Sequence, residues 1–364
     1  MTTAPRQRPQ RTHIFIIDGT MSRLDDGDET NAGLLFKLLS ELGPRSDQSV
    51  GYHPGVQASG LRKWINVAAG TGINQSIRAG YAALCSRYEP GDKIMLMGFS
   101  RGAYAVRSLA GFISRIGLLR RNDATERRIE RAFRYYEADR MTRSAKEFCL
   151  AFCHTDVPIE FLGVWDTVKA LGLPYPILNR LAPMATEFHD HGLSPNTRHA
   201  YQALALDENR TSYEPLPWRI GAGFQGVVEQ MWFAGAHSDI GGHVGVRPAA
   251  RTLANLPLVW MLERAVGCGM VLPDNWRAEF PLNPVAPMLG PYKGSARFFV
   301  ARRPREVGLC SSEAIHPSVY VRMSKRKRYA PRALISLPAH QTELERRERE
   351  RIPKAPPKRP EPAQ

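Results

Sequence analysis

A serine lies at the centre of a glycine-flanked turn, because residues 98–102 read Gly-Phe-Ser-Arg-Gly. An apolar stretch, 93–97, leads into this turn, and residues 103–110, which have the composition of a helix, lead out of it. A strand, Gly-x-Ser-x-Gly and a helix in this order form the sequence pattern of a nucleophile elbow. The glycines let strand and helix cross closely, and the serine hydroxyl then points out of the sheet edge at a helix N-terminus. The pattern favours Ser100 as a nucleophile over a chance Gly-Ser-Gly turn.

A serine nucleophile needs a base and an orienting acid, and the sequence offers both further along the chain. Asp166 follows the apolar run 157–164 and a tryptophan, and His237 follows the apolar run 230–235 and an alanine. The carboxyl ends of parallel strands share one edge of a sheet, so the three side chains can converge there. We therefore predict a triad in which Ser100 is the nucleophile, Asp166 the acid and His237 the base.

Other residues compete for the roles of acid and base. Asp166 precedes Thr167 and would also serve as a helix cap. Asp239 is an alternative acid, although a position two residues from the base suits a loop-stabilising carboxylate better. His237 could be an ordinary loop histidine, and His316 is the alternative base. The sequence leaves these alternatives open.

An oxyanion formed at the serine would need two backbone N–H donors. The residue after the nucleophile, Arg101, supplies one of them. The second is expected from the end of an early strand, where Gly19 lets the backbone approach closely. The neighbouring Asp18 is expected to form the turn and to have no part in the chemistry.

Alternating apolar patterns predict the elements that must position these residues. We expect strands at 13–17, 93–97, 157–164 and 230–235, and helices at 31–42, 76–88, 101–116, 125–140, 199–206 and 253–266. Strands that alternate with helices predict an α/β fold with a mostly parallel sheet and helices on both of its faces. A proline-punctuated connection, 171–195, is expected to form a lid or insert after the strand that bears the acid.

The net charge of +15 is concentrated at the ends of the chain. Residues 322–364 hold 13 Lys or Arg against 5 Asp or Glu, and the first twelve residues hold three Arg. We therefore expect a basic, disordered arm at 1–12, one catalytic domain at 13–321, and a basic, proline-rich and disordered tail at 322–364. The tail could contact anionic lipid or nucleic acid, but no specific nucleic-acid partner is expected.

The five cysteines are expected to be reduced thiols in the core, because Cys149 and Cys153 lie in a largely apolar segment and no second ligand pair occurs at zinc-site spacing. Neither a metal nor another cofactor is expected. The first residues lack the apolar segment of a signal peptide, and no apolar run reaches the roughly 20 residues of a membrane span. We therefore expect a product that is cytoplasmic as synthesised.

The chain resembles a specific family at several blocks of sequence. The blocks are residues 16–20 (Ile-Ile-Asp-Gly-Thr), 98–104 (Gly-Phe-Ser-Arg-Gly-Ala-Tyr), 161–168 (Phe-Leu-Gly-Val-Trp-Asp-Thr-Val), 188–190, 193–195, 203–208 and 232–242. They are similar to those of a family of uncharacterised α/β-hydrolase domains. The family includes the catalytic domain of the first family of type VI secretion phospholipase effectors.

The resemblance implies a phospholipase whose triad maps onto Ser100, Asp166 and His237. It also implies an ester or phospholipid substrate, export by a type VI system, and a secretion-system or immunity-protein partner. Two other functions compete with this one: a cytoplasmic esterase of small esters, and a non-catalytic binding protein of the same fold that is recruited by its basic tail.

Overall fold

Seven parallel strands form the central sheet of this protein. The structure is a computed structural model that describes residues 8–20, 22–56, 71–138, 140–168, 192–221, 223–292 and 301–335. Every neighbouring pair of strands in the sheet is parallel. Across the sheet the order is β2 (Gln48–His53), β1 (Thr12–Ile17), β3 (Lys93–Phe99), β6 (Ile159–Trp165), β7 (Thr197–Ala205), β8 (Val227–Phe233) and β9 (Glu313–Ile315).

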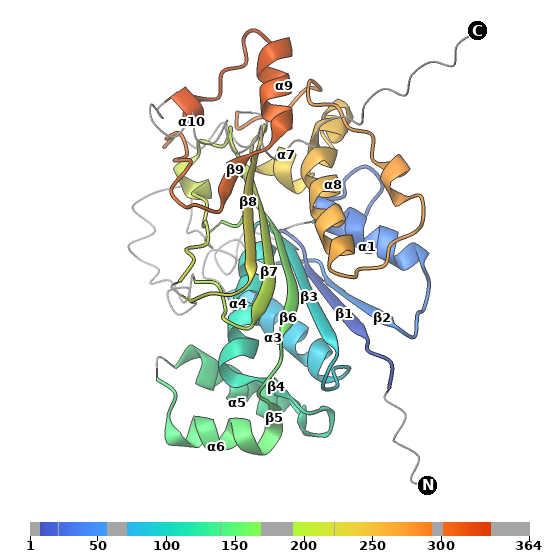
Figure 1. The fold of residues 1–364 in the computed structure, drawn as a ribbon, viewed down its shortest axis with the longest axis vertical. Helices are drawn as coiled ribbons and strands as arrows, with labels where there is room; N and C mark the ends of the chain where they lie inside the picture. Colours follow the sequence, from blue (N-terminus) through green and yellow to red (C-terminus); the bar gives the residue numbers. More distant parts are fainter. Residues whose placement is uncertain are drawn as a thin grey trace, which may run out of the picture.

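Helices cover both faces of this sheet, which confirms the predicted α/β fold, an α/β-hydrolase-like architecture (Figure 1). On one face lie α3 (Thr71–Cys85) and α4 (Arg101–Ile116), and on the other lie α1 (Asn31–Glu41) and α8 (Arg251–Gly267). Such a sheet is apolar on both sides, and this explains the uninterrupted apolar runs of β1 and β3.

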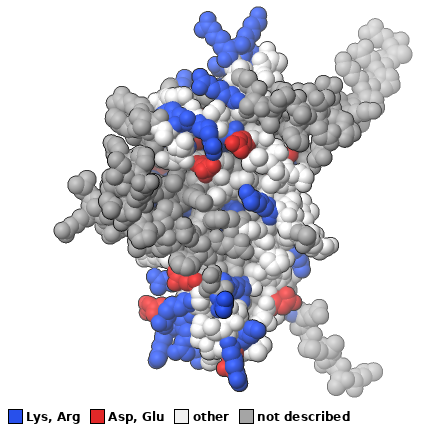
Figure 2. Space-filling view, turned by 90° about the vertical axis from the view of Figure 1, so that its left-hand side faces the viewer, with Lys and Arg blue, Asp and Glu red and all other residues white. Residues whose placement is uncertain are grey.

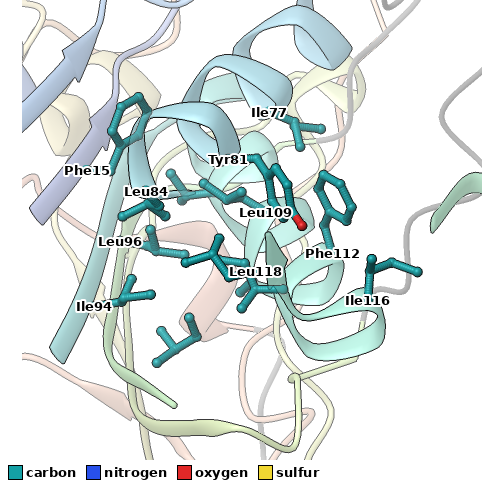
Figure 3. Packing of buried hydrophobic residues seen from close by; sticks show 14 of the residues in the cluster. Phe15, Ile77, Tyr81, Leu84, Ile94, Leu96, Leu109, Phe112, Ile116 and Leu118 are labelled. Carbon is teal, nitrogen blue, oxygen red and sulfur yellow. The ribbon is translucent and has the colours of Figure 1, made fainter. Parts of the chain in front are cut away.

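Successive residues of the central strands point to opposite faces, as the pleat requires. In β3, Ile94 and Leu96 join the core under α3 and α4, whereas Met95 and Met97 join the core under α1 and α8. Figure 3 shows the first of these cores, where Leu96 packs towards the two helices. The sheet is thereby fixed from both sides, and so are the strand ends that carry the candidate site.

A small second sheet and the helices next to it lie at the amino end of the central strands (Figure 1). A two-stranded antiparallel sheet, β4 (Leu118–Leu119) and β5 (Cys153–His154), holds α6 (Arg143–Phe152) beside α5 (Glu126–Glu137). The outer side of α5 is charged, and Figure 2 shows Lys and Arg interleaved with Asp and Glu at this end of the molecule. This confirms the surface helix expected over 125–140. No helix in the described ranges is both long and apolar enough to cross a bilayer.

All five cysteines are free thiols, and four of them are buried, as expected of core residues. Cys310 is the exception, because it is only partly buried. In the described part of the chain, no three His, Cys, Asp or Glu side chains are grouped so that they could hold a metal ion.

One predicted element is wrong. The sequence predicts a helix over residues 199–206, but 199–205 belong to strand β7 and residue 206 follows it. Their alanines and leucines favour a helix in isolation. In the fold, however, β7 lies between β6 and β8 with both faces covered, and Ala200, Ala203 and Leu204 are fully buried. Tertiary packing here overrides local propensity.

The ordered fold continues past the expected end of the domain at residue 321. That boundary falls inside α9 (Pro317–Lys325), and a further helix, α10 (Arg332–Ile335), follows it. Arg322, Ala333 and Leu334 are buried, the last two in a cluster that also contains residues of β7 and β8. The structure thus contradicts a disordered tail over residues 322–335, and residues 336–364 lie outside the described residues.

At the N-terminus, the last residues of the expected arm at 1–12 are part of the described fold. Arg8 pairs with Asp92 at 2.6 Å, and Thr12 is the first residue of β1. Residues 1–7 are not described. The expected lid at 171–195 also lies outside the described residues as far as residue 191.

Candidate active site

Ser100 lies between β3 and α4 in a backbone conformation that L-residues rarely adopt. Its φ is 58° and its ψ is −120°, so the chain turns sharply at this residue. A Cβ atom on residue 98 would lie 2.7 Å from the Gly102 carbonyl, and one on residue 102 would lie 2.2 Å from the Ile17 carbonyl oxygen. Both distances are far too short for a real contact. Only glycine at 98 and 102 therefore permits this close crossing of strand and helix.

Ser100, Asp166 and His237 form one chain of hydrogen bonds. Ser100 Oγ lies 2.8 Å from His237 Nε2, and His237 Nδ1 lies 2.6 Å from Asp166 Oδ2. The residues reach one another because they follow the carboxyl ends of β3, β6 and β8, with His237 opening the short helix α7 (His237–Gly241). In this order, the imidazole can accept the hydroxyl proton while the carboxylate fixes its tautomer.

His237 is held in a buried setting between two aromatic rings. The Phe99 ring lies 4.8 Å from the imidazole, and the Tyr213 ring meets it edge-on at 4.9 Å. The His237 backbone N–H donates to Glu208 Oε2 at 3.2 Å. Burial lowers the pKa of His237, although its bond to Asp166 acts in the opposite direction. A lowered pKa keeps the imidazole neutral near pH 7, as a base must be.

The Asp166 carboxylate is fully buried and receives donors on both oxygens. Oδ1 accepts the Ala205 N–H at 2.9 Å and Arg305 Nη1 at 2.6 Å, and Oδ2 accepts Arg305 Nη2 at 3.0 Å besides His237. Burial alone would raise the pKa of Asp166, but the charge of Arg305 and the bond from His237 hold it well below its usual range. The helix-cap alternative for Asp166 does not describe this arrangement.

Arg305 is absent from the residues that the sequence singles out. It lies 139 residues beyond Asp166 in a connection without a recognisable motif. No spacing or composition near it indicates that its guanidinium is buried, so only the fold identifies it.

The turn after β1 is organised by the buried Asp18 carboxylate. Its oxygens accept four donors: the Gly19 N–H at 2.6 Å and the hydroxyls of Ser22 at 3.0 Å, Thr30 at 2.7 Å and Tyr52 at 2.8 Å. Burial raises the pKa of Asp18. This is the turn-forming role expected for the side chain, and it ties β1, α1 and β2 together next to the elbow.

The same bond corrects the expected role of Gly19. Its N–H points to the Asp18 carboxylate and is not available to an oxyanion. Thr20, the next residue, has a buried hydroxyl with no hydrogen-bond partner in the described ranges. Arg101 opens α4, where the first N–H groups of a helix point out of its N-terminus. Its backbone therefore lies where the sequence places an oxyanion donor.

The two alternative residues have other partners. His316 caps α9, accepts the Ser318 N–H at 3.3 Å and stacks on Phe233 at 4.5 Å, and burial lowers its pKa to about 4. Asp239 accepts the backbone N–H groups of Ala236, Leu289 and Gly290 at 2.6–3.0 Å. Neither residue bonds to Ser100 or His237 in the described structure, and Asp239 stabilises a loop.

Comparison with known proteins links this chain to a protein family and to a curated relative. The family model described as "T6SS, Phospholipase effector Tle1-like, catalytic domain" matches residues 11–264. The uncharacterized protein YEL023C of Saccharomyces cerevisiae is 29% identical over 229 residues, which are 56% of this chain and 32% of that protein.

Two solved structures are similar over parts of their length. A crystal structure of an uncharacterized protein from Pseudomonas aeruginosa has a TM-score of 0.49 and 18% identity, and the match covers 76% of this chain and 49% of that one. The structure of the Tle1 effector bound to the VgrG spike from the type VI secretion system has a TM-score of 0.32 and 19% identity, with 65% and 51% covered.

The chain spans about a third of the yeast protein and about half of each solved chain. The family model, in contrast, matches well over half of this chain, and its residues 11–264 include Ser100, Asp166 and His237. This protein therefore belongs to the family of Tle1-like type VI secretion phospholipase effectors, and the part that matches is the catalytic domain of that family.

Proposed function

We propose that this protein is a serine ester hydrolase that cleaves acyl esters of phospholipids through an acyl-serine intermediate. The observation that carries the proposal is the continuous chain of hydrogen bonds from Ser100 through His237 to Asp166. Membership in a phospholipase effector family supports a lipid ester as the substrate class.

The geometry supports a two-step reaction. Ser100 Oγ attacks the ester carbonyl carbon as its proton passes to His237 Nε2, and the N–H of Arg101 stabilises the resulting oxyanion. The carbon–oxygen bond of the leaving group then breaks, and the alcohol takes the proton from His237. Water repeats the attack on the acyl-serine, releasing the fatty acid and restoring Ser100. Asp166 keeps the imidazole oriented throughout and balances the charge of the imidazolium.

The test is hydrolysis of phospholipid liposomes and of a short acyl ester by wild type and Ser100→Ala. We expect the variant to lose both activities by at least about a thousandfold, because the nucleophile is removed. Undiminished turnover by Ser100→Ala would disprove the assignment. If wild type cleaves the short ester and leaves liposomes intact, the hydrolase stands and the protein is an esterase of small esters.

A matched pair of histidine variants tests the base. His237→Ala should lose activity to the same extent as Ser100→Ala, because the serine then has no proton acceptor. His316→Ala should retain its turnover, because His316 bonds to the start of its own helix. The opposite result would show that His316 is the base.

Export by a type VI system, and binding to a secretion-system component or an immunity protein, rest on family membership alone. They stay predictions, which secretion of the protein by strains with and without a type VI sheath would test.

A further inference from the structure

Arg305 is a buried cation that reaches the Asp166 carboxylate from outside the family match. It is 6% exposed and lies 41 residues past the end of that match at residue 264. Its two terminal nitrogens bond to the two carboxylate oxygens at 2.6 and 3.0 Å, a bidentate pair. The same nitrogens donate to the Ala205 carbonyl at 3.0 Å and the Tyr213 carbonyl at 2.6 Å. These two backbone carbonyls hold the Arg305 guanidinium in place, independently of its contact with the carboxylate.

These contacts determine how the carboxylate is turned. Arg305 bonds to both oxygens and the Ala205 N–H bonds to Oδ1, and in this orientation Oδ2 faces His237 Nδ1. A carboxylate without the guanidinium could rotate about its last bond and turn its oxygens out of line with His237 Nδ1. The backbone of Asp166 is strained, because its φ is 43°. It therefore needs partners that hold it in place.

Other charged groups lie near the site, and two of them pair with each other. Glu208 and Arg210 form their own ion pair at 2.6 Å, and Arg210 lies over the Tyr213 ring at 3.7 Å. The Tyr213 ring meets His237, and Arg101 follows Ser100 in the chain. In the described ranges, Arg305 is the cation that forms an ion pair with Asp166.

We propose that Arg305 is the positioning residue of the site: its bidentate contact locks the Asp166 carboxylate so that one oxygen faces His237, and its charge balances that carboxylate. The inference rests on the proposed hydrolase function and adds to it a residue from the part of the chain that the family model does not match.

Removing this charge should shift the pH dependence of kcat/KM in the same direction whether Asp166 or His237 takes up the proton. In Arg305→Met, the pair of Asp166 and His237 lies in the same buried site with one positive charge fewer. Both possible protonated forms of the pair become easier to form, and both block the base. The acidic limb of the kcat/KM profile should therefore move to higher pH, by about one to three units. The maximal kcat/KM should fall about 10- to 100-fold, as it does when groups that orient a site are lost.

Arg305→Lys separates charge from geometry. Lysine keeps the positive charge but cannot hold both oxygens in a planar fork. The acidic limb should then stay within about half a unit of wild type, while kcat/KM still falls several-fold. If Arg305 had a purely structural role, the acidic limb of the kcat/KM profile would stay at the wild-type pH in both variants.

The experiment measures pH profiles with a short ester and with a fluorophosphonate reagent. The reagent needs no knowledge of the natural substrate: Ser100 Oγ bonds to phosphorus, fluoride leaves and His237 takes the serine proton. The matched control is Arg322→Met. Arg322 is also buried, at 2% exposed, but donates to the carbonyls of Pro284 and Ala286. This control should lower the unfolding midpoint and leave the acidic limb unchanged.

The results separate the two proposals. Labelling of wild type but not of Ser100→Ala, with the limb moved in Arg305→Met and restored in Arg305→Lys, supports both. If Ser100 behaves as proposed while folded Arg305→Met keeps the wild-type limb, the role of Arg305 is refuted and the hydrolase stands. Should Arg305→Met fail to fold, an unchanged rate in Arg305→Lys refutes it instead. Equal labelling of wild type and Ser100→Ala would overturn the function and the inference together.

Discussion

Backbone strain in this protein is concentrated at two residues of the candidate site. In the described structure, the residues other than glycine with a left-handed φ are Ser100 at 58° and Asp166 at 43°. Such conformations cost about 1–3 kcal/mol each and persist only where the surroundings impose them. At Ser100 the surroundings are the close crossing of β3, α4 and the end of β1. At Asp166 they are its hydrogen-bond donors. Backbone strain and the chain of hydrogen bonds therefore point to the same site.

The elbow should not tolerate a methyl group at residue 102. In Gly102→Ala, the new Cβ would lie 2.2 Å from the Ile17 carbonyl oxygen and 2.3 Å from that of Asp18. These are backbone atoms, so the turn itself must move. We expect a loss of about 1–3 kcal/mol in the free energy of unfolding, measured by urea denaturation. Turnover should fall at least about a hundredfold, because small misplacements of a nucleophile are costly.

The control for this prediction is Gly267→Ala at the end of α8. A Cβ there meets nothing within 4 Å, and alanine favours a helix over glycine. This variant should match or slightly exceed the stability of wild type. Equal stability and turnover in both variants would show that the elbow is looser than the structure indicates.

At the scale of elements, the sequence identifies a strand wherever a buried run is β-branched or bulky. The strands that carry Ser100, Asp166 and His237 are of this kind, so their order along the chain and their shared edge were predictable. Strand β7 was not, because its alanines favour a helix and only its place between β6 and β8 decides otherwise. The contacts of Arg305 and of the Asp18 carboxylate could not be predicted from the sequence for a related reason. Their partners are distant in sequence, and no local pattern records them.

Asp207 links two such distant elements, and its ionisation should affect stability. Its Oδ2 accepts the Gly235 N–H at 2.7 Å and the Tyr329 hydroxyl at 2.8 Å, which joins the end of β7 to the turn after α9. Burial raises the pKa of Asp207 to about 6, from 3.8. Between these two values the folded protein holds a proton that the unfolded chain has released. The free energy of unfolding therefore decreases as the pH rises through this window.

Asp207→Asn removes this titration and keeps an oxygen that can accept both bonds. Above pH 6 we expect the variant to be more stable than wild type, by up to about 2–3 kcal/mol. At pH 4 the two should be nearly equal. The measurement is urea denaturation at several values between pH 4 and pH 8, with the exposed Asp274→Asn as the control. Parallel curves for wild type and Asp207→Asn would contradict the buried, ionisable role of Asp207.

At the scale of the whole molecule, the folded unit that holds the candidate site is larger than the part that matches the family model. Residues after 264 supply β9 at the edge of the sheet, the N–H groups of Leu289 and Gly290 to Asp239, and Arg305 to Asp166. They also supply the buried residues of α9 and α10. These contacts reach the strand ends that bear the candidate site, so the C-terminal segment is part of the structure that holds this site in place.

Chains shortened at two positions test this extent of the fold. A chain ending at residue 335 keeps every contact described, and we expect it to retain the unfolding midpoint and turnover of the full chain. A chain ending at residue 321 loses Ala333 and Leu334 from their cluster, the bond from Tyr329 to Asp207, and the bonds of Arg322. Its free energy of unfolding should fall by at least about 2 kcal/mol, since buried side chains are removed. Because Arg305 and β9 remain, the folded fraction should still hydrolyse esters with an unchanged acidic limb. If the chain ending at 321 is as stable as the full chain, the fold ends where the sequence alone predicted.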